Sequence, residues 1–82
     1  MELFELAIIT PTESTTVQVE WLEVDSPTGS CLVCAGHSPL VSMLKTKSSL
    51  TYKPAHATPV ICQVSQGLLR IAENKATVLL DT

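Results

Sequence analysis

The sequence has few charged residues and no long apolar run. Only 16% of its 82 residues are charged, and the net charge is −3. The basic residues are scattered, so the chain lacks the basic stripe that neutralises nucleic-acid phosphates. No apolar run approaches the roughly 20 residues that cross a bilayer, and the acidic start lacks the basic residues of a signal peptide. We therefore expect a cytoplasmic protein with no nucleic-acid partner and no direct membrane insertion.

The residue types that would build an active site are also scarce. The three glycines stand singly, so the sequence has no glycine-rich loop that could hold a phosphate. The two histidines, His37 and His56, lie in separate Pro/Gly loops, without a Ser-His-Asp, Cys-His or paired-carboxylate arrangement. We expect His37 to hydrogen-bond the backbone of its own Gly-His-Ser-Pro turn. The sequence thus predicts a protein that is not an enzyme, with no cofactor and no small-molecule substrate.

Three cysteines cannot form a complete disulfide framework, because an odd number leaves one thiol over. Cys31 and Cys34 lie in a strand-like run, where residues three apart face opposite sides and lie roughly 10 Å apart. One metal ion could not then use both thiols. We interpret the cysteines as buried apolar filler. Two alternatives remain: a redox pair, and a small metal-binding module in which Cys62, His37 or His56 completes the ligands.

Short alternating runs separated by turn residues predict an all-β fold. The length fits one domain, over residues 1–82. Apolar residues alternate in several segments, and the phase of alternation changes at Leu22 and Val24, which predicts a β-bulge or a strand covered on both sides. Glu73-Asn74-Lys75 predicts a hairpin turn. The expected strands centre on Phe4–Ile8, Val17–Val24, Cys31–Cys34, Leu50–Tyr52, Val60–Val64, Leu69–Ile71 and Ala76–Leu80.

One segment is also compatible with a short helix. Ser38 could cap it, Pro39 suits the first helical position, and Leu40, Met43 and Leu44 have helical spacing. The two interpretations of this segment, helix and extended chain, stay open at the level of sequence.

Four blocks of the sequence resemble the epsilon subunit of F-type ATP synthases. Leu6-Ala7-Ile8-Ile9-Thr10-Pro11 resembles the family's opening strand, and Gly36-His37-Ser38-Pro39-Leu40 resembles its G-H-x-P-L turn. Gln66 to Ile71 is similar to G-G-I-L-E-V, and Asn74 to Thr82 is similar to N-x-V-T-V-L-A-D-T. The blocks occur in the family's order and cover nearly the whole chain, so together they are much more specific than any one of them.

The resemblance implies an all-β fold, a two-sheet antiparallel β-sandwich, and a non-catalytic role. Epsilon subunits sit in the central stalk, where they dock on the gamma subunit and the c-ring and help to couple ion-driven rotation to ATP synthesis. By position, Thr10 and Ser42 would meet gamma, whereas Ser30 and His37 would face the c-ring. The implied location is peripheral, on the inner face of the energy-transducing membrane.

The sequence also departs from the family. Ala35 replaces a proline, Ser30 replaces a residue that is acidic in some members, and Lys45-Thr46-Lys47 replaces a Lys-Pro-Gly turn. The chain ends at Thr82, where the family continues into a helical hairpin that carries inhibition of ATP hydrolysis, so that activity is not transferred. The alternatives to a stalk subunit are the metal-binding module and a stand-alone β-sandwich adaptor.

Overall fold

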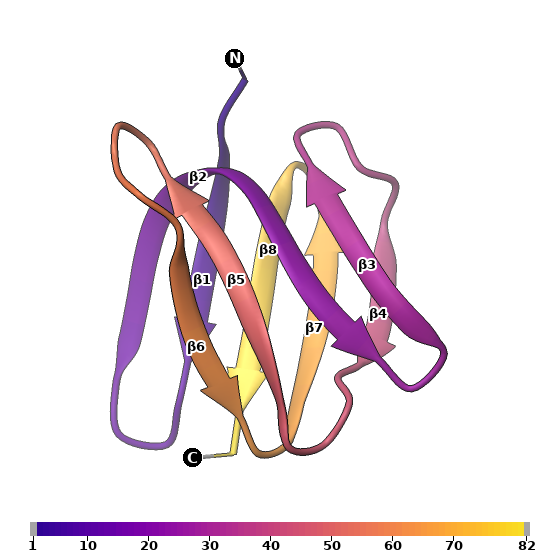
Figure 1. Ribbon diagram of the computed structural model, residues 1–82. Helices are drawn as coiled ribbons and strands as arrows, with labels where there is room; N and C mark the ends of the chain where they lie inside the picture. The colour runs from indigo at the N-terminus through magenta and orange to yellow at the C-terminus, as the bar shows by residue number, and fades with distance from the viewer. Residues whose placement is uncertain (1, 82) are drawn as a thin grey trace.

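The alternating segments of the sequence form eight strands in the computed structural model, which describes residues 2–81 (Figure 1). No helix forms within that range. The strands are β1 (Phe4–Ile9), β2 (Ser14–Ser26), β3 (Gly29–Cys34), β4 (Leu40–Met43), β5 (Ser48–Pro54), β6 (Val60–Val64), β7 (Gly67–Ala72) and β8 (Lys75–Leu80).

The strands form two packed layers that share the long strand β2. Hydrogen bonding follows the order β4-β7-β8-β1-β2-β5-β6, and β3 also pairs with β2. Residues 14–19 of β2 pair with β1, whereas residues 21–26 pair with β3. We call β4, β7, β8, β1 and residues 14–19 layer 1, and β3, residues 21–26, β5 and β6 layer 2. Figure 1 shows β2 crossing from one layer to the other.

The crossing occurs at the place where the sequence changes phase. The pairing of β2 with β5 shifts register between Val19 and Trp21, which confirms the predicted β-bulge. A bulge adds one residue to one strand and bends it. Here the extra residue turns the apolar side chains of both halves of β2 toward the space between the layers, so that Val19, Leu22 and Val24 are all buried.

The core lies between the layers and is almost entirely aliphatic. Its buried side chains come from both layers, and close packing of a protein interior makes a domain stiff. Its members are Phe4, Leu6, Ile8, Val19, Leu22, Val24, Val33, Leu44, Leu50, Val64, Leu69, Ile71, Ala76 and Val78.

The predicted two-sheet sandwich is confirmed, with one parallel pair. Every other strand pair of the described residues is antiparallel, but β1 and β8 run in the same direction, with Ile9 opposite Leu79. Parallel strands need a long connection, and nearly the whole chain lies between these two. The segment for which a helix was considered is extended, because β4 pairs with β7 as an edge strand.

The turns gather at two ends of the sandwich. Figure 1 shows the links β3–β4, β5–β6 and β7–β8 at the end near the N-terminus, and the links β1–β2, β4–β5 and β6–β7 at the end near the C-terminus. The predicted hairpin turn is confirmed: Glu73 and Asn74 join β7 to β8, with φ of 50° and 60°. Two successive positive φ values match the twist of a two-residue hairpin.

Candidate docking surface

A row of apolar side chains crosses the outward face of layer 1. Met43 of β4 lies opposite Leu68 of β7, Leu68 opposite Leu79 of β8, and Leu79 opposite Ile9 of β1. Side chains directly opposite in neighbouring strands lie on the same face. We call Met43, Leu68, Leu79 and Ile9 the apolar row.

Strand alternation places the apolar row outside the core. In β7 and β8 the residues that flank Leu68 and Leu79 on the inward side, Leu69 and Val78, are fully buried. Met43 is 69% exposed and Leu79 is 43% exposed, and the half-buried Leu68 lies between them. Contiguous exposed apolar patches of this kind mark interaction surfaces more often than isolated side chains do.

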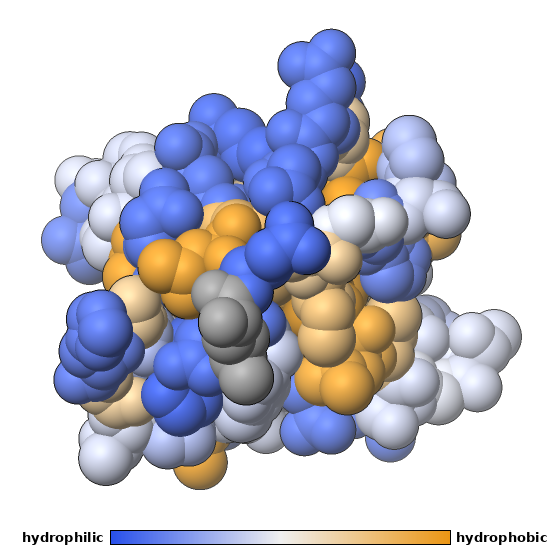
Figure 2. All heavy atoms as spheres, turned by 90° about the horizontal axis from the view of Figure 1, so that it is seen from above, coloured by the Kyte–Doolittle hydropathy of each residue, from blue (hydrophilic) through white to orange (hydrophobic). Residues whose placement is uncertain are grey.

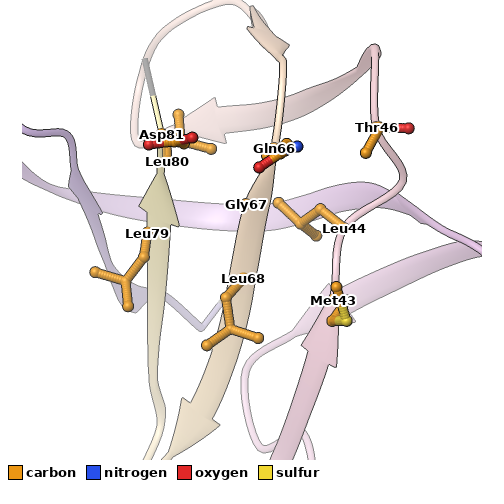
Figure 3. Close-up of a pocket in the computed structure, with 9 residues that line it drawn as sticks. All are labelled: Met43, Leu44, Thr46, Gln66, Gly67, Leu68, Leu79, Leu80 and Asp81. Carbon is orange, nitrogen blue, oxygen red and sulfur yellow. The ribbon is translucent and has the colours of Figure 1, made fainter.

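A hollow of about 430 Å³ continues the apolar row toward the end of the sandwich that holds the C-terminus (Figure 3). Gly67 lies in its wall, at a point where the surrounding atoms are too close for a side chain. A Cβ atom there would lie 2.9 Å from the carbonyl oxygen of Leu79, 2.9 Å from the Leu80 side chain and 3.1 Å from that of Leu44. The hollow is lined by Met43, Leu44, Thr46, Gln66, Gly67, Leu68, Leu79, Leu80 and Asp81.

Polar and charged residues bound the apolar row on the other side. Four residues away along the same strands, Lys75 lies opposite both Glu5 and Ala72, and its Nζ is 3.0 Å from the Glu5 carboxylate. Between this pair and the apolar row, Arg70 lies opposite Thr77. The outward face of layer 1 therefore changes from apolar to charged along the direction of its strands.

The two residues expected to meet gamma lie next to the two ends of the apolar row. Thr10 directly follows Ile9, and its hydroxyl donates to the carbonyl oxygen of Glu13 at 3.2 Å, which fixes the β1–β2 turn. Ser42 directly precedes Met43. Because successive side chains of a strand point to opposite faces, Ser42 faces the other side of β4, where it is half-buried. The structure brings the neighbours of Thr10 and Ser42 onto one face, but not their own side chains.

Ser42 instead shares a hollow with Ser30. This hollow lies between the edge strands β3 and β4, and Leu40 and Leu69 contribute apolar atoms to it. The sequence assigned Ser30 and Ser42 to different partners, so their proximity was not foreseen. No signal in a single sequence gives it, because β3 and β4 belong to different layers.

His37 lies far from Ser30, in the turn that follows the other end of β3. A six-residue strand spans roughly 20 Å, so the two residues expected to face the c-ring stand at opposite ends of this edge. The His37 ring hydrogen-bonds its own turn, as predicted, through Nδ1 to the carbonyl oxygen of Ser38 at 2.7 Å. Viewed from this end, the molecule shows hydrophobic patches separated by hydrophilic residues (Figure 2).

The prediction that the cysteines fill the core was wrong for one of them. Cys31 and Cys62 are half-buried and pack against the core, but Cys34 is exposed. The reason is strand alternation, since Cys34 lies three residues after Cys31 and beside Trp21 on the outward face of layer 2. Within residues 2–81, no three His, Cys, Asp or Glu side chains are close enough to hold a metal ion.

Cys62 also affects the only tyrosine of the chain. Burial between the layers raises the pKa of Tyr52 above its ordinary value of 10.0, and the neighbouring Cys62 thiol raises that pKa further, by its charge and by a hydrogen bond. Burial disfavours the charged phenolate, so the tyrosine is held in its neutral form.

Comparison with known proteins places this fold in a family. A family model described as "ATP synthase, Delta/Epsilon chain, beta-sandwich domain" matches residues 3–82. The chain belongs to this family. The resemblance found in the four sequence blocks is thereby confirmed. No curated protein matches the delta/epsilon-type chain described here.

A solved structure shares its fold. The delta/epsilon-type chain superposes with a TM-score of 0.80 and 10% identity on a chain of the cryo-EM structure of the Tetrahymena thermophila mitochondrial ATP synthase, central stalk/c-ring. The match covers 95% of this chain and 63% of that chain, so the sandwich spans less than two thirds of the length of its structural relative. Among residues 2–81 there is no helix of the length and hydrophobicity that crossing a membrane requires.

Proposed function

We propose that the chain is a non-catalytic central-stalk subunit of an ATP synthase, and that it docks on the gamma subunit through the outward face of layer 1. The single observation that carries the docking proposal is the apolar row. Membership of the delta/epsilon family supports the stalk role. The chemistry of ATP synthesis takes place in other subunits, and this chain transmits rotation, for which a closely packed sandwich is suited.

The apolar row is suited to a stable contact with gamma. Stable complexes bury about 1,200–2,000 Å² in total, and a few central apolar side chains contribute most of the affinity. Met43, Leu68 and Leu79 form such a centre, with the adjoining hollow available to a projecting side chain of the partner. Thr10, which follows Ile9, would lie at the rim of this contact, whereas Ser42 would take part through its backbone, because its side chain faces the other side of β4.

A second contact, with the polar loops of the c-ring, would run along β3. Ser30 and His37 stand at its two ends, and β3 is an edge strand whose one pairing partner among residues 2–81 is β2. A contact that includes both residues must therefore follow the length of this edge. It would leave layer 1 free for gamma, so that one sandwich can join both partners at the membrane-peripheral foot of the rotor.

Co-purification with gamma tests the docking proposal. Met43→Arg places a charge in the centre of the contact without touching the core, so it should abolish co-purification. Glu73→Arg, in the β7–β8 turn at the far end, is the matched control and should bind as the unaltered chain does. A thermal melt of each variant checks the fold. If Met43→Arg binds gamma normally, layer 1 is not the docking face; if the unaltered chain does not bind gamma at all, the chain is a stand-alone adaptor.

A further inference from the structure

The turn that carries His37 is tied to a distant hairpin by one side chain. The backbone N–H of Gly36 donates to Oδ1 of Asn74 at 2.8 Å, across 38 positions of the sequence. Gly36 lies in the link by which the chain passes from layer 2 to layer 1, and Asn74 lies in the β7–β8 turn of layer 1. The hydrogen bond therefore joins the two layers at the end of the sandwich shown in Figure 2.

The residue types at both ends of this hydrogen bond suit it. Asn74 has φ of 60°, a conformation that asparagine tolerates better than most residues. Gly36 has φ of 82°, which glycine adopts without strain. Glu73 shares the left-handed conformation of the hairpin turn but is not hydrogen-bonded to Gly36. Asn74 thus does more than complete the turn, since its side-chain carbonyl also holds a second loop.

The same loop fixes the ring of His37. The His37 N–H donates to the carbonyl oxygen of Cys34 at 3.2 Å, and ring Nδ1 is 2.7 Å from the carbonyl oxygen of Ser38. A carbonyl oxygen only accepts, so Nδ1 must carry the hydrogen. In the neutral ring Nε2 is then an acceptor, and it is the ring nitrogen left for a partner.

We propose that Asn74 is a positioning residue: by holding Gly36 it orients His37, which presents Nε2 as an acceptor to a hydrogen-bond donor of the c-ring. The part that concerns the c-ring rests on the proposed function. The part that concerns the turn does not, because the hydrogen bonds lie within this chain. The donor on the partner is an N–H or O–H group, such as a side-chain amide or hydroxyl.

Amide hydrogen exchange in the isolated full chain tests the positioning. Asn74→Gly keeps a residue suited to positive φ but removes the acceptor, so the Gly36 amide should exchange roughly 3–10-fold faster, the range expected for the loss of one hydrogen bond. Glu73→Gly alters the same turn without that acceptor and should leave the Gly36 amide unchanged. Asn74→Asp keeps Oδ1 and should retain protection. Equal exchange in Asn74→Gly and the unaltered chain would overturn the proposal.

Affinity for purified c-ring, measured with a double-mutant cycle, tests the consequence. Asn74→Gly and His37→Ala should each weaken binding, and the double variant should bind no more weakly than His37→Ala alone, because both changes act on one contact. Additive losses would show that Asn74 acts independently of His37 and would overturn its positioning role. If His37→Ala leaves c-ring affinity unchanged, the c-ring contact of the proposed function fails, while the exchange result still decides the role of Asn74 in the turn.

Discussion

Both layers expose hydrophobic side chains, but they differ in whether a row of them continues unbroken across neighbouring strands. On layer 2, Leu32 and Ile61 are 57% and 65% exposed, which lies between the 43% of Leu79 and the 69% of Met43 in the apolar row. The register places Glu23 and Thr51 between them, in the order Leu32, Glu23, Thr51, Ile61. On layer 1 the corresponding order is Met43, Leu68, Leu79, Ile9, with no polar residue in between.

Under the proposed function, continuity of the exposed side chains, rather than the amount of exposed hydrophobic area, would distinguish the docking face. A partner that covered the row on layer 2 would have to bury the Glu23 carboxylate or find a cation for it, which is costly in a dry contact. A partner on layer 1 meets no such cost along the apolar row. The register of the strands decides whether polar residues interrupt the row, and the amino-acid composition does not reveal that register.

The largest expected effect is a loss of affinity for gamma when an exposed leucine of layer 1, but not of layer 2, is replaced by arginine. Leu79→Arg should weaken binding by about 30-fold or more, as loss of a central apolar contact does. Leu32→Arg makes the same change at an exposed leucine of layer 2 and should leave affinity unchanged. Titration calorimetry of both variants with purified gamma measures the difference. Equal losses would contradict the distinction between the two faces.

A smaller effect is expected at the hollow that extends the apolar row. Gly67→Ala should destabilise the fold by about 1–3 kcal/mol, because the added Cβ meets the Leu79 carbonyl and the packed Leu80 and Leu44 side chains. Ser65→Ala, in the same β6–β7 turn and exposed, is the control and should change stability by less than about 0.5 kcal/mol. Urea unfolding of both variants gives the two free energies. An unchanged free energy of unfolding for Gly67→Ala would mean that the atoms around Gly67 leave room for a methyl group.

A gain in stability is expected where the chain passes back from layer 1 to layer 2. Lys47, in the β4–β5 link, has φ of 53°, at the position where the related turn has glycine. A left-handed conformation costs a residue with a Cβ roughly 1 kcal/mol, so Lys47→Gly should raise the melting temperature. Lys45→Gly, two residues earlier, should lower it or leave it unchanged. A lower melting temperature for Lys47→Gly would show that this conformation carries no strain.

The smallest effect concerns the inner side of layer 2. The folded-state pKa of Tyr52 is raised, so its contribution to stability is complete below the pKa of the unfolded chain and is lost as pH rises through the folded pKa. Because Tyr52 is the only tyrosine, an alkaline absorbance titration reports on it alone. The midpoint should lie above 10.0 and should fall part of the way back in Cys62→Val. A midpoint at or below 10.0 would contradict burial as the main cause.

The sequence predicted the strands well because strand alternation is a local property. The bulge in β2 and the Glu73-Asn74 turn were visible as a change of phase and as turn chemistry, and both are confirmed. Local alternation failed where it was short: β4 has four residues, and its spacing also fitted a helix. Cys34 was placed in the core because its residue type is usually buried, although alternation from Cys31 puts it outside.

The candidate docking surface was only partly visible in the sequence. Thr10 and Ser42 were chosen by resemblance and lie beside Ile9 and Met43, but the row that joins these two depends on the pairing of four strands. The parallel β1–β8 pair brings Ile9 to Leu79, 70 positions away. Contacts at such separations are properties of the whole topology. The same holds for the hydrogen bond between Gly36 and Asn74.

Methyl NMR of the chain, titrated with purified gamma, directly tests whether layer 1 is the face that docks on gamma. The method reports on each apolar side chain of both faces. We expect the methyl signals of Met43, Leu68, Leu79 and Ile9 to shift or broaden on binding. Signals of Leu32 and Ile61, which are exposed on layer 2, should stay in place. Changes at Leu32 and Ile61 with none in the apolar row would contradict the assignment of layer 1 as the face that docks on gamma.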